Sequence, residues 1–343
     1  KIEIDKAWKI AEESPEVTYN FQNELEDVFK KYKPHTIKPS LAKTSKRFVD
    51  AISEGLRQSM IKHNNLILMG QDIAEYGGVF KVTDGFCKQF GKDRVRNTPI
   101  CESAIVSACL GLSISGYKSV MEMQFADFVT SGFNPIVNNL AKTHYRWGEN
   151  ADVVIRMPTG AGVGAGPFHS QSNEAWFTHT PGLKVVYPAF PEDAKGLLIA
   201  SINDPNPIMY FEHKALYRSC KMDVSDDYFT IDIGKANLLR SGSDVSIITY
   251  GLGVHWALEV LDNNVDISAD LIDLRTLSPL DNDSIIQSVR KTGKAIILQE
   301  DSLFGGLAFK NGNVDINTWP DTDKKKYIDG ESGSILDDID SEQ

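Results

Sequence analysis

Short apolar runs alternate with helical stretches along most of the chain, and this alternation limits the fold more than any other feature. The apolar runs cover residues 66–69, 119–123, 153–155, 184–187 and 207–211, with helical stretches around 103–115, 127–145, 172–179 and 191–202. Strands that are separated by helices are joined by crossover connections, which make neighbouring strands parallel. The pattern predicts an α/β domain with a mostly parallel sheet and an active site at the carboxyl ends of its strands.

A second, smaller α/β unit follows from about residue 225. Its predicted strands cover 245–250, 270–274 and 295–298, and its predicted helices cover 254–262 and 281–291. Pro279 precedes the second helix, and Asp281 stands where an N-cap side chain accepts a backbone hydrogen bond. From about residue 312 the sequence is acidic and rich in Asp, Ser and Gly, which is typical of a tail.

The first 32 residues are charged and amphipathic, and they predict a helix that ends near Ser14 and Pro15, followed by a second short helix. Prolines and lysines make residues 33–40 a predicted linker. Apolar residues at helical spacing from Phe48 to Met60 then begin the main domain. We therefore divide the chain into a helical appendage and linker (1–40), a main α/β domain (41–222), a smaller α/β domain (223–310) and an acidic tail (311–343).

Charge and cysteine usage argue against several classes of function. Asp and Glu outnumber Lys and Arg by 47 to 36, and the net charge of -11 disfavours nucleic-acid binding. The four cysteines lack disulfide or metal-ligand spacing, which indicates reduced thiols and a reducing compartment such as the cytoplasm. No apolar run approaches the roughly 18 residues of a membrane span, so no membrane partner is expected.

Glu102 is the first candidate for chemistry, because it lies between an apolar segment and a helical sequence that begins at Ser103. Partial loss of water disfavours a charged carboxylate, so we expect a raised pKa that suits acid–base chemistry near neutrality. Alternatively, Glu102 belongs to the first turn of the helix, where a negative charge suits the helix dipole. Position alone favours this structural role, so the neighbouring motifs must decide.

Glycines alternate from Gly160 to Gly166 after a predicted strand, a pattern that can let backbone N–H groups approach phosphate. The dinucleotide fingerprint G-x-G-x-x-G is not met, because Ala165 or Pro167 occupies its third glycine position. The run leads instead to His169, on a loop where an imidazole can face a cleft and transfer protons. A surface histidine is the alternative.

Gln124 and Phe128 follow the strand predicted over 119–123, again at a carboxyl edge of the sheet. A phenylalanine in this position can stack on a flat heterocycle, and a glutamine can hydrogen-bond to it. The alternative is that Phe128 belongs to the core and Asp127 caps a helix.

The motifs that contain these candidates occur in one order along about residues 45–308. They are YGGVFKVTDG (76–85), NTPICE (97–102), QFAD (124–127), GAGPFHSQS (164–172), EAWF (174–177), PGLKVV (181–186), DPNP (204–207), FEHK (211–214) and IDLRTL (272–277). Together they resemble the beta subunit of the thiamine-diphosphate-dependent decarboxylase component of 2-oxo acid dehydrogenase complexes, particularly the branched-chain (2-oxoisovalerate) type. The resemblance implies a transketolase-like pyrimidine-binding domain, followed by a smaller, incomplete transketolase C-terminal-like domain.

The resemblance also implies roles for individual residues. It places Glu102 on the glutamate that hydrogen-bonds the aminopyrimidine ring nitrogen and activates the cofactor, which needs a carboxyl with a raised pKa. His169 matches an active-site histidine that positions or protonates intermediates and serves acyl transfer to a lipoyl arm. Ile100 and Gln124 would line the pyrimidine site. Phe128 stands where many relatives have tyrosine, so stacking is kept and a hydroxyl contact is not.

The implied cofactors are thiamine diphosphate with Mg²⁺, and K⁺ at a monovalent cation site. The sequence contains no Gly-Asp-Gly, the motif on which the family binds Mg²⁺ and diphosphate, so an alpha half must supply this part. The cation site would use the side chains of Asp204 and Asn206 and carbonyl oxygens near Ala151, Val153, Val154 and Ser201.

The implied enzyme is a lipoamide-acylating oxidoreductase that decarboxylates a branched-chain 2-oxo acid and reductively acylates lipoyl-lysine. The preference rests on the pattern from His169 to Phe177. The alternatives are a pyruvate or acetoin dehydrogenase beta component, and a non-catalytic scaffold for an alpha half. Glu102 and His169 argue against the scaffold.

The implied partners are an alpha half, a lipoylated acyltransferase and a second beta unit, within a heterotetramer. Residues 1–32 resemble the C-terminal end of an alpha subunit, and the chain starts at Lys1. We therefore expect an excerpt from an alpha–beta fusion, with an N-terminal extension of a free beta subunit as the alternative.

Overall fold

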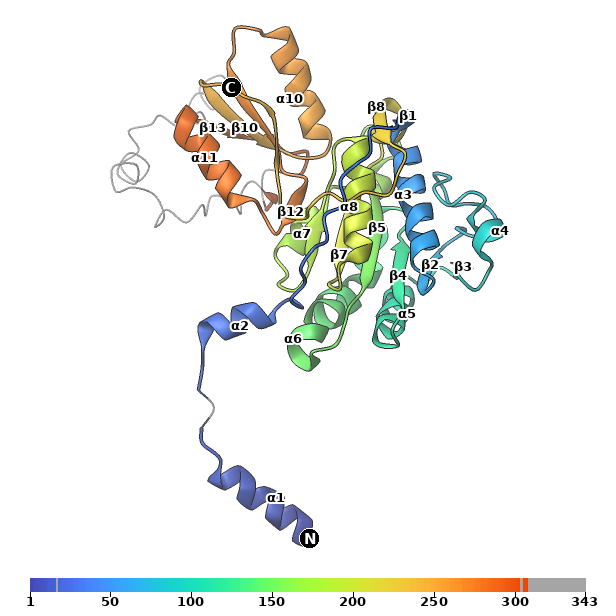
Figure 1. Cartoon of the computed structure of the whole chain (residues 1–343), viewed down its shortest axis with the longest axis vertical. Helices are drawn as coiled ribbons and strands as arrows, with labels where there is room; N and C mark the ends of the chain where they lie inside the picture. Colours follow the sequence, from blue (N-terminus) through green and yellow to red (C-terminus); the bar gives the residue numbers. More distant parts are fainter. Residues whose placement is uncertain (17, 303–304, 308–343) are drawn as a thin grey trace.

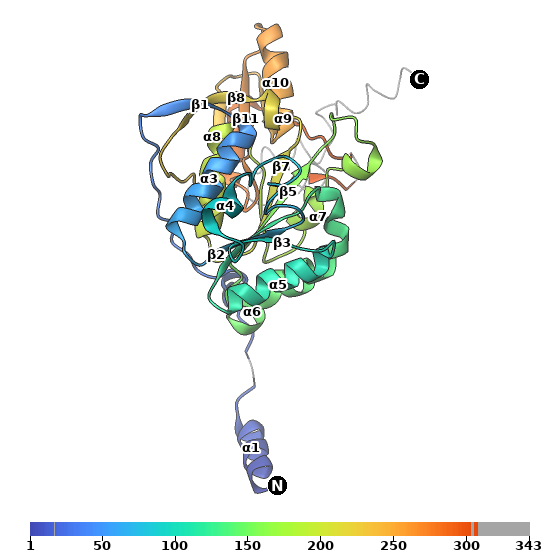
Figure 2. The same ribbon diagram turned by 90° about the vertical axis from the view of Figure 1, so that its right-hand side faces the viewer.

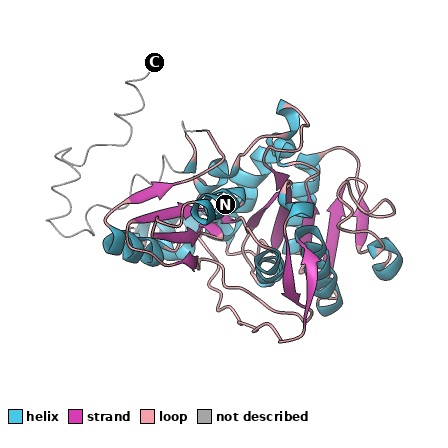
Figure 3. Ribbon diagram, turned by 90° about the horizontal axis from the view of Figure 1, so that it is seen from above, coloured by secondary structure: helices cyan, strands magenta, loops and turns pink. Residues whose placement is uncertain are grey.

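The computed structural model describes residues 1–16, 18–302 and 305–307, so the acidic tail predicted over 311–343 lies outside the described residues. A seven-stranded sheet forms the centre of the main domain, and a four-stranded sheet forms a smaller unit beside it (Figures 1 and 3). The main sheet has the order β12-β6-β7-β5-β4-β2-β3. Its strands are β2 (Leu66–Gly70), β3 (Val95–Asn97), β4 (Lys118–Glu122), β5 (Val153–Thr159), β6 (Lys184–Val186), β7 (Ile208–His213) and β12 (Thr276–Ser278). All neighbours pair in parallel except β12 with β6, which confirms the predicted α/β fold with a mostly parallel sheet.

Helices cover both faces of this sheet, as strands that bury both faces require. Helices α3 (Phe48–Lys62) and α8 (Pro191–Asn203) pack together on one face, and α5 (Glu102–Ile114) covers the other (Figure 2). Side chains alternate along each strand, so Val120 joins the core under α3 while the next residue, Met121, joins the core under α5.

The stretch predicted as helical over 127–145 forms a series of short turns. They are η1 (Ala126–Gly132), η2 (Pro135–Asn139), η3 (Leu140–Lys142) and α6 (Thr143–Trp147). Pro135 lacks a backbone N–H, and η2 adopts π-helical geometry from that residue onward. The four other short helical segments of the main domain are α4 (Phe86–Phe90), η4 (Pro167–His169), α7 (Glu174–Thr178) and α9 (Leu216–Ser219).

Strand β5 continues beyond the apolar run predicted over 153–155, because the next residue, Arg156, is charged and yet buried inside the strand. Arg156 is 1% exposed, and its guanidinium donates to Glu122 at 2.8 Å and to both oxygens of Glu212 at 2.7 and 2.8 Å. Tyr217 donates to the same Glu212 carboxylate at 2.6 Å. The partners come from the adjacent strands β4 and β7, so only strand pairing reveals how the charge is compensated.

The smaller unit has the strand order β13-β10-β11-β9. Its elements are β9 (Asn237–Arg240), β10 (Val245–Thr249), α10 (Leu252–Asn263), β11 (Ala269–Asp273), α11 (Asn282–Thr292) and β13 (Ala295–Ile297). Asp281 accepts a hydrogen bond from the Ser284 N–H at 3.3 Å, which confirms the predicted N-cap. Strand β12 leaves this unit and pairs with β6, so the main sheet takes its edge strand from the C-terminal half.

The N-terminal segment contains the two predicted helices, α1 (Ile2–Glu13) and α2 (Phe21–Asp27). Helix α1 has no buried residue and projects away from the two domains (Figure 1). The residues after α2 lie along the main domain, where the Lys30 N–H donates to Asn206 at 2.7 Å and the Ile37 N–H donates to Thr230 at 2.8 Å. Residues 28–40, which include the predicted linker, therefore form a strap that is hydrogen-bonded to the rest of the chain. It leads into an unpredicted antiparallel pair, β1 (Lys43–Arg47) with β8 (Lys221–Ser225).

All four cysteines are free thiols, as their spacing predicts. Burial raises the pKa of Cys109 to about 12 and that of Cys220 to about 11, so both remain protonated thiols at neutral pH. None of the described helices combines the length and apolar character that a membrane crossing requires.

Candidate functional site

The candidate site lies at the carboxyl edge of the main sheet, where the chain leaves β4 and enters η1. The ring of Phe128 is 5.6 Å from the ring of His169, and both rings pack edge-on against Phe125, at 5.6 and 4.7 Å. The structure thus brings together two residues that are 41 positions apart in sequence and were predicted for one site. Phe125 completes this aromatic cluster. It belongs to the motif QFAD (124–127), but the sequence did not indicate a role for it.

Glu102 is the first residue of α5 and is 8% exposed. Gln71 donates to its Oε1 at 3.0 Å, and none of the described residues donates to its Oε2. A Cβ added at Gly132 would lie 3.7 Å from the backbone of Glu102, so α5 and η1 are in contact at this point. Glu102 therefore occupies the first helical turn, as the structural alternative states, and is also buried beside the turn that carries Phe128.

The other two residues predicted for the pyrimidine site lie near these groups along the chain and differ in exposure. Gln124 is half-buried between β4 and η1. Ile100, two residues before Glu102, is 82% exposed, so it lines a pocket only if another molecule covers it.

His169 is carried on a glycine-rich loop that connects β5 with α7. Gly160, Gly162, Gly164 and Gly166 all have positive φ, between 70° and 88°, a region that favours glycine. The loop closes on itself where the Gly160 N–H donates to the Gln171 carbonyl at 3.1 Å. The glycines therefore shape a reversal of the chain that presents His169, and no long helix follows to form a phosphate site.

Asp127 anchors the far end of this loop. Its Oδ1 accepts from the Gln171 N–H at 3.0 Å, and its side chain makes no capping hydrogen bond in η1. The helix-cap alternative for Asp127 is therefore wrong, because the carboxylate reaches a segment far along the chain.

Two further buried ionisable groups surround the loop. Burial lowers the pKa of Lys214 to about 8, partly offset by the negative charges of Asp127 and Glu300, and its Nζ has no hydrogen-bond partner among the described residues. Burial raises the pKa of Glu174 to about 7, although Tyr250 donates to its carboxylate at 2.7 Å. Both residues belong to motifs on which the family resemblance rests. Their burial and their neighbours, however, could not be read from the sequence.

The predicted cation site does not offer a free ligand set in this structure. Lys184 donates to Asp204 Oδ2 at 2.5 Å, and Asn206 donates to Asp204 Oδ1 at 2.8 Å. Asn206 Oδ1 in turn accepts from the Lys30 N–H. A cation at Asp204 and Asn206 would have to displace these donors, and the described residues contain no cluster of three or more His, Cys, Asp or Glu side chains suited to a metal. The cation site remains a prediction.

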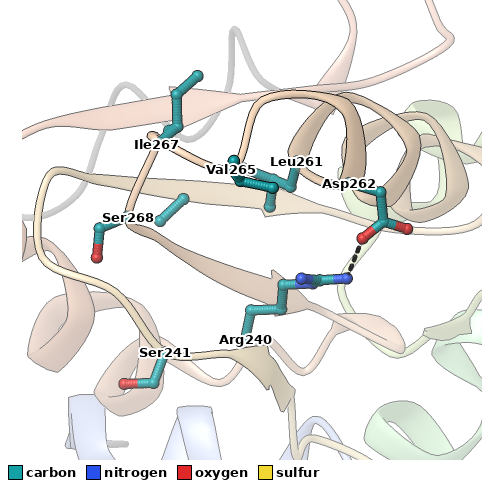
Figure 4. Close-up of a pocket in the computed structure, with 8 residues that line it drawn as sticks. Arg240, Ser241, Leu261, Asp262, Val265, Ile267 and Ser268 are labelled. Carbon is teal, nitrogen blue, oxygen red and sulfur yellow. Dashed lines mark hydrogen bonds and ion pairs between the residues drawn. The ribbon is translucent and has the colours of Figure 1, made fainter.

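A cavity of about 360 Å³ lies in the smaller unit, between the end of α10 and the edge strand β9 (Figure 4). An ion pair between Arg240 and Asp262 lies at this cavity, which none of the predicted site residues lines.

Two domain families match the chain: the transketolase pyrimidine-binding domain over residues 45–219, and the transketolase C-terminal domain over residues 234–310. The fold is similar to that of a solved protein described as a split gene transketolase, inactive beta4 tetramer. That similarity has a TM-score of 0.67 at 22% sequence identity and covers 80% of this chain and 86% of the other. The chain therefore has the transketolase fold, with a pyrimidine-binding domain followed by a C-terminal domain.

The sequence relatives define the family more closely. The chain is 42% identical over 264 residues to the 2-oxoisovalerate dehydrogenase subunit beta of Bacillus subtilis and 44% identical over 264 residues to the pyruvate dehydrogenase E1 component subunit beta of the same organism. Each match covers 76% of this chain and 81% of the relative. A pyruvate dehydrogenase E1 component subunit beta of Staphylococcus aureus is 43% identical over 256 residues, 74% of this chain and 79% of that protein. The chain belongs to the family of E1 beta subunits of 2-oxo acid dehydrogenases, and these similarities do not separate the branched-chain type from the pyruvate type.

Proposed function

We propose that the chain is the beta component of a thiamine-diphosphate-dependent 2-oxo acid dehydrogenase, active together with an alpha half. In this role it takes part in decarboxylation of a 2-oxo acid and in reductive acylation of lipoyl-lysine on an acyltransferase. The observation that carries the proposal is the contact between α5 and η1, which puts buried Glu102 beside the turn that holds Phe128 and, through it, His169.

The residues of this cluster fit the pyrimidine end of thiamine diphosphate. Glu102 has one carboxylate oxygen held by Gln71, while the other is not bonded by any described residue and would hold a ring nitrogen. Phe128 supplies an aromatic surface for a flat heterocycle, and half-buried Gln124 supplies a hydrogen-bonding amide. When bound, the cofactor supplies the electron sink that makes loss of the carboxylate as carbon dioxide possible.

His169 is the residue placed to handle protons and to orient the acyl group. Edge-on contacts with Phe125 and Phe128 fix the plane of its imidazole, while the ring remains half-buried. An imidazole held in this way can donate or accept a proton at a ring nitrogen without a large change in its position.

The partners follow from what this chain lacks. The sequence has no Gly-Asp-Gly, so an alpha half would bring Mg²⁺ and the diphosphate contacts, and it would also cover exposed Ile100. We therefore propose a heterotetramer of two alpha and two beta halves that meets a lipoylated acyltransferase. Calorimetric titration of thiamine diphosphate with Mg²⁺ tests this arrangement: binding should require the alpha half, and tight binding by this chain alone would contradict it.

Replacement of Glu102 is the sharpest test of the active-site assignment. Glu102→Gln keeps the shape of the side chain but removes its acidic group, so kcat of the complex with the alpha half should fall by at least about 100-fold. Glu259→Gln, on the exposed surface of α10, is the matched control and should leave kcat unchanged. Activity of Glu102→Gln within a few fold of the native complex would refute the role of Glu102 and favour a non-catalytic scaffold.

For the substrate, we propose a branched-chain 2-oxo acid. The pattern from His169 to Phe177 and the 2-oxoisovalerate relative support this choice. Pyruvate is the second candidate, supported by the pyruvate dehydrogenase relatives, and acetoin is a further alternative. Comparison of kcat/KM for 2-oxoisovalerate, pyruvate and acetoin decides among them, and a preference for pyruvate would overturn our choice.

A further inference from the structure

Glu300 belongs to the smaller C-terminal unit but reaches the loop that carries His169. It follows β13, and its Oε1 accepts a hydrogen bond from the Ala161 N–H at 2.9 Å. Its Oε2 accepts from Ser172 Oγ at 3.4 Å. One carboxylate therefore touches residues at both ends of the glycine-rich loop, which leaves the main domain after β5 and returns to it at α7.

His213 forms a further hydrogen bond with the Glu300 carboxylate. It is fully buried at the end of β7, and its Nδ1 accepts from the Ala215 N–H at 3.2 Å, so the ring proton sits on Nε2. That nitrogen donates to Glu300 Oε2 at 2.7 Å. A Cβ at residue 160 would overlap the His213 ring. Only glycine therefore allows the loop to begin beside His213 and Glu300.

Glu300 stays charged in these surroundings. Burial alone would raise its pKa, but the donors from His213, Ala161 and Ser172 outweigh burial and lower the pKa below its ordinary value. Hydrogen bonds to a charged acceptor are stronger than those between neutral groups. The carboxylate is thus a firm anchor for the loop over the neutral pH range.

A second contact between the two units lies just beyond the loop. Tyr250, at the end of β10, donates to Glu174, the first residue of α7, at 2.7 Å. The C-terminal unit therefore holds the chain on both sides of His169, through Glu300 at residues 161 and 172 and through Tyr250 at residue 174.

We propose that Glu300 is a positioning residue, which clamps the two ends of the 161–172 loop and so holds His169 against Phe125 and Phe128. This inference gives the C-terminal unit a direct role at the active site. Its catalytic consequence rests on the proposed function of His169, whereas the clamp itself does not.

Amide hydrogen exchange of the wild-type chain and of Glu300→Ala tests the clamp without any assay of activity. The Ala161 amide loses its charged acceptor in the variant, so peptides over residues 160–172 should exchange at least about tenfold faster. Glu259→Ala, which removes an exposed carboxylate of α10, is the control and should leave this exchange unchanged. Unchanged protection of the loop in a folded Glu300→Ala protein would overturn the proposal.

The isosteric variant Glu300→Gln provides a second test of the clamp in case Glu300→Ala does not fold. It keeps one carbonyl oxygen for the Ala161 N–H but brings an N–H donor toward His213, so an intermediate rate of loop exchange is expected. A rate equal to that of the native chain would contradict the need for the carboxylate.

Kinetics of the complex with the alpha half then test the catalytic consequence. Glu300→Ala should lower kcat at least about tenfold, because a small displacement of a reacting group is costly, while KM and thiamine diphosphate affinity stay within about threefold. Equal losses in kcat and in cofactor affinity would indicate a general structural role and overturn the proposal. If the native complex shows no dehydrogenase activity, the proposed function fails, and the exchange experiment still decides the clamp.

Discussion

Two buried ionisable residues near the loop of His169 have pKa values close to neutrality. Glu174 and Lys214 both lie inside the protein, and burial moves their pKa values to about 7 and about 8. Each change follows from desolvation of the charged form, which acts in opposite directions on an acid and a base. Two groups that titrate near neutrality thus flank the loop that presents the proposed catalytic histidine.

Glu174 should make the stability of the protein depend on pH in a specific direction. Burial raises its pKa from 4.5 to about 7, so the folded protein binds this proton more tightly than the unfolded chain. The stabilising contribution is present below pH 4.5 and is lost as pH rises to about 7. At 1.36 kcal/mol per pKa unit the loss is on the order of 3 kcal/mol.

Glu174→Gln removes this titration but keeps an oxygen that accepts from Tyr250. Compared with wild type, the free energy of unfolding of the variant should rise by up to about 3 kcal/mol between pH 4.5 and pH 8, measured by urea unfolding. Glu259→Gln is the exposed control and should follow the wild-type profile. Parallel pH profiles for Glu174→Gln and wild type would show that Glu174 is ionised in the folded protein throughout this range.

At the scale of elements, the N-terminal segment contains two different structures. Helix α1 has no buried residue, and its apolar side chains Ile4, Trp8 and Ile10 are 71%, 67% and 68% exposed. The strap after α2, in contrast, is bonded to Asn206 of the main domain and to Thr230, which lies between β8 and β9. Stability should therefore come from the strap and not from α1.

Deletion of residues 1–19 removes α1 and keeps Asn20, which caps α2 by accepting from the Asn23 N–H at 3.1 Å. The free energy of unfolding should change by less than about 0.5 kcal/mol, because none of the described residues that the deletion removes is buried. Deletion of residues 1–40 is the comparison and should be clearly destabilising, because it leaves the strap's partners unpaired. Substantial destabilisation by the shorter deletion would show that α1 packs against the folded chain in solution.

In the whole molecule the two domains share a hydrophobic core. Tyr187 of the main domain and Tyr250 of the smaller unit pack with their ring centroids 5.2 Å apart, and Leu277 of β12 joins the same core. Arg275, just before β12, forms an ion pair with Asp193 of α8 at 2.6 Å. This interface combines a shared apolar core with polar contacts and is crossed by a strand, so we expect the domains to unfold together.

Leu277→Ala tests this coupling. The residue is 4% exposed, so the substitution should cost about 2–5 kcal/mol and move a single calorimetric transition to lower temperature without splitting it. Leu238→Ala, on the outer strand β9 where the side chain is 53% exposed, is the matched control and should leave the transition nearly unchanged. Two separate transitions in the native chain or in Leu277→Ala would show that the domains unfold independently.

Local sequence was sufficient for much of the architecture. Apolar periodicity predicted the parallel strands β2, β4, β5, β6 and β7 and the helices α3, α5 and α8, because a strand or helix that is buried on a domain core must carry a regular apolar pattern. It missed β1, β3, β8, β9 and β12, which are short or lie at sheet edges, where pairing with a neighbour decides the conformation. The helix predicted over 127–145 is broken into short turns, and the π-helical turn begins at Pro135, which has no backbone N–H to donate.

The sequence by itself determined the fold class, the order of the main apolar strands and long helices, the family and the candidates Glu102, Phe128 and His169. It did so because the ends of apolar strands and the order of the motifs can be identified from local sequence. Only the tertiary structure decided what each charged group meets: Arg156 with Glu122 and Glu212, Asp127 with the Gln171 N–H, and Glu300 with the loop of His169. These partners lie on different strands and in different domains, and a charge is stable in the interior only where chain folding brings its partner within hydrogen-bonding distance.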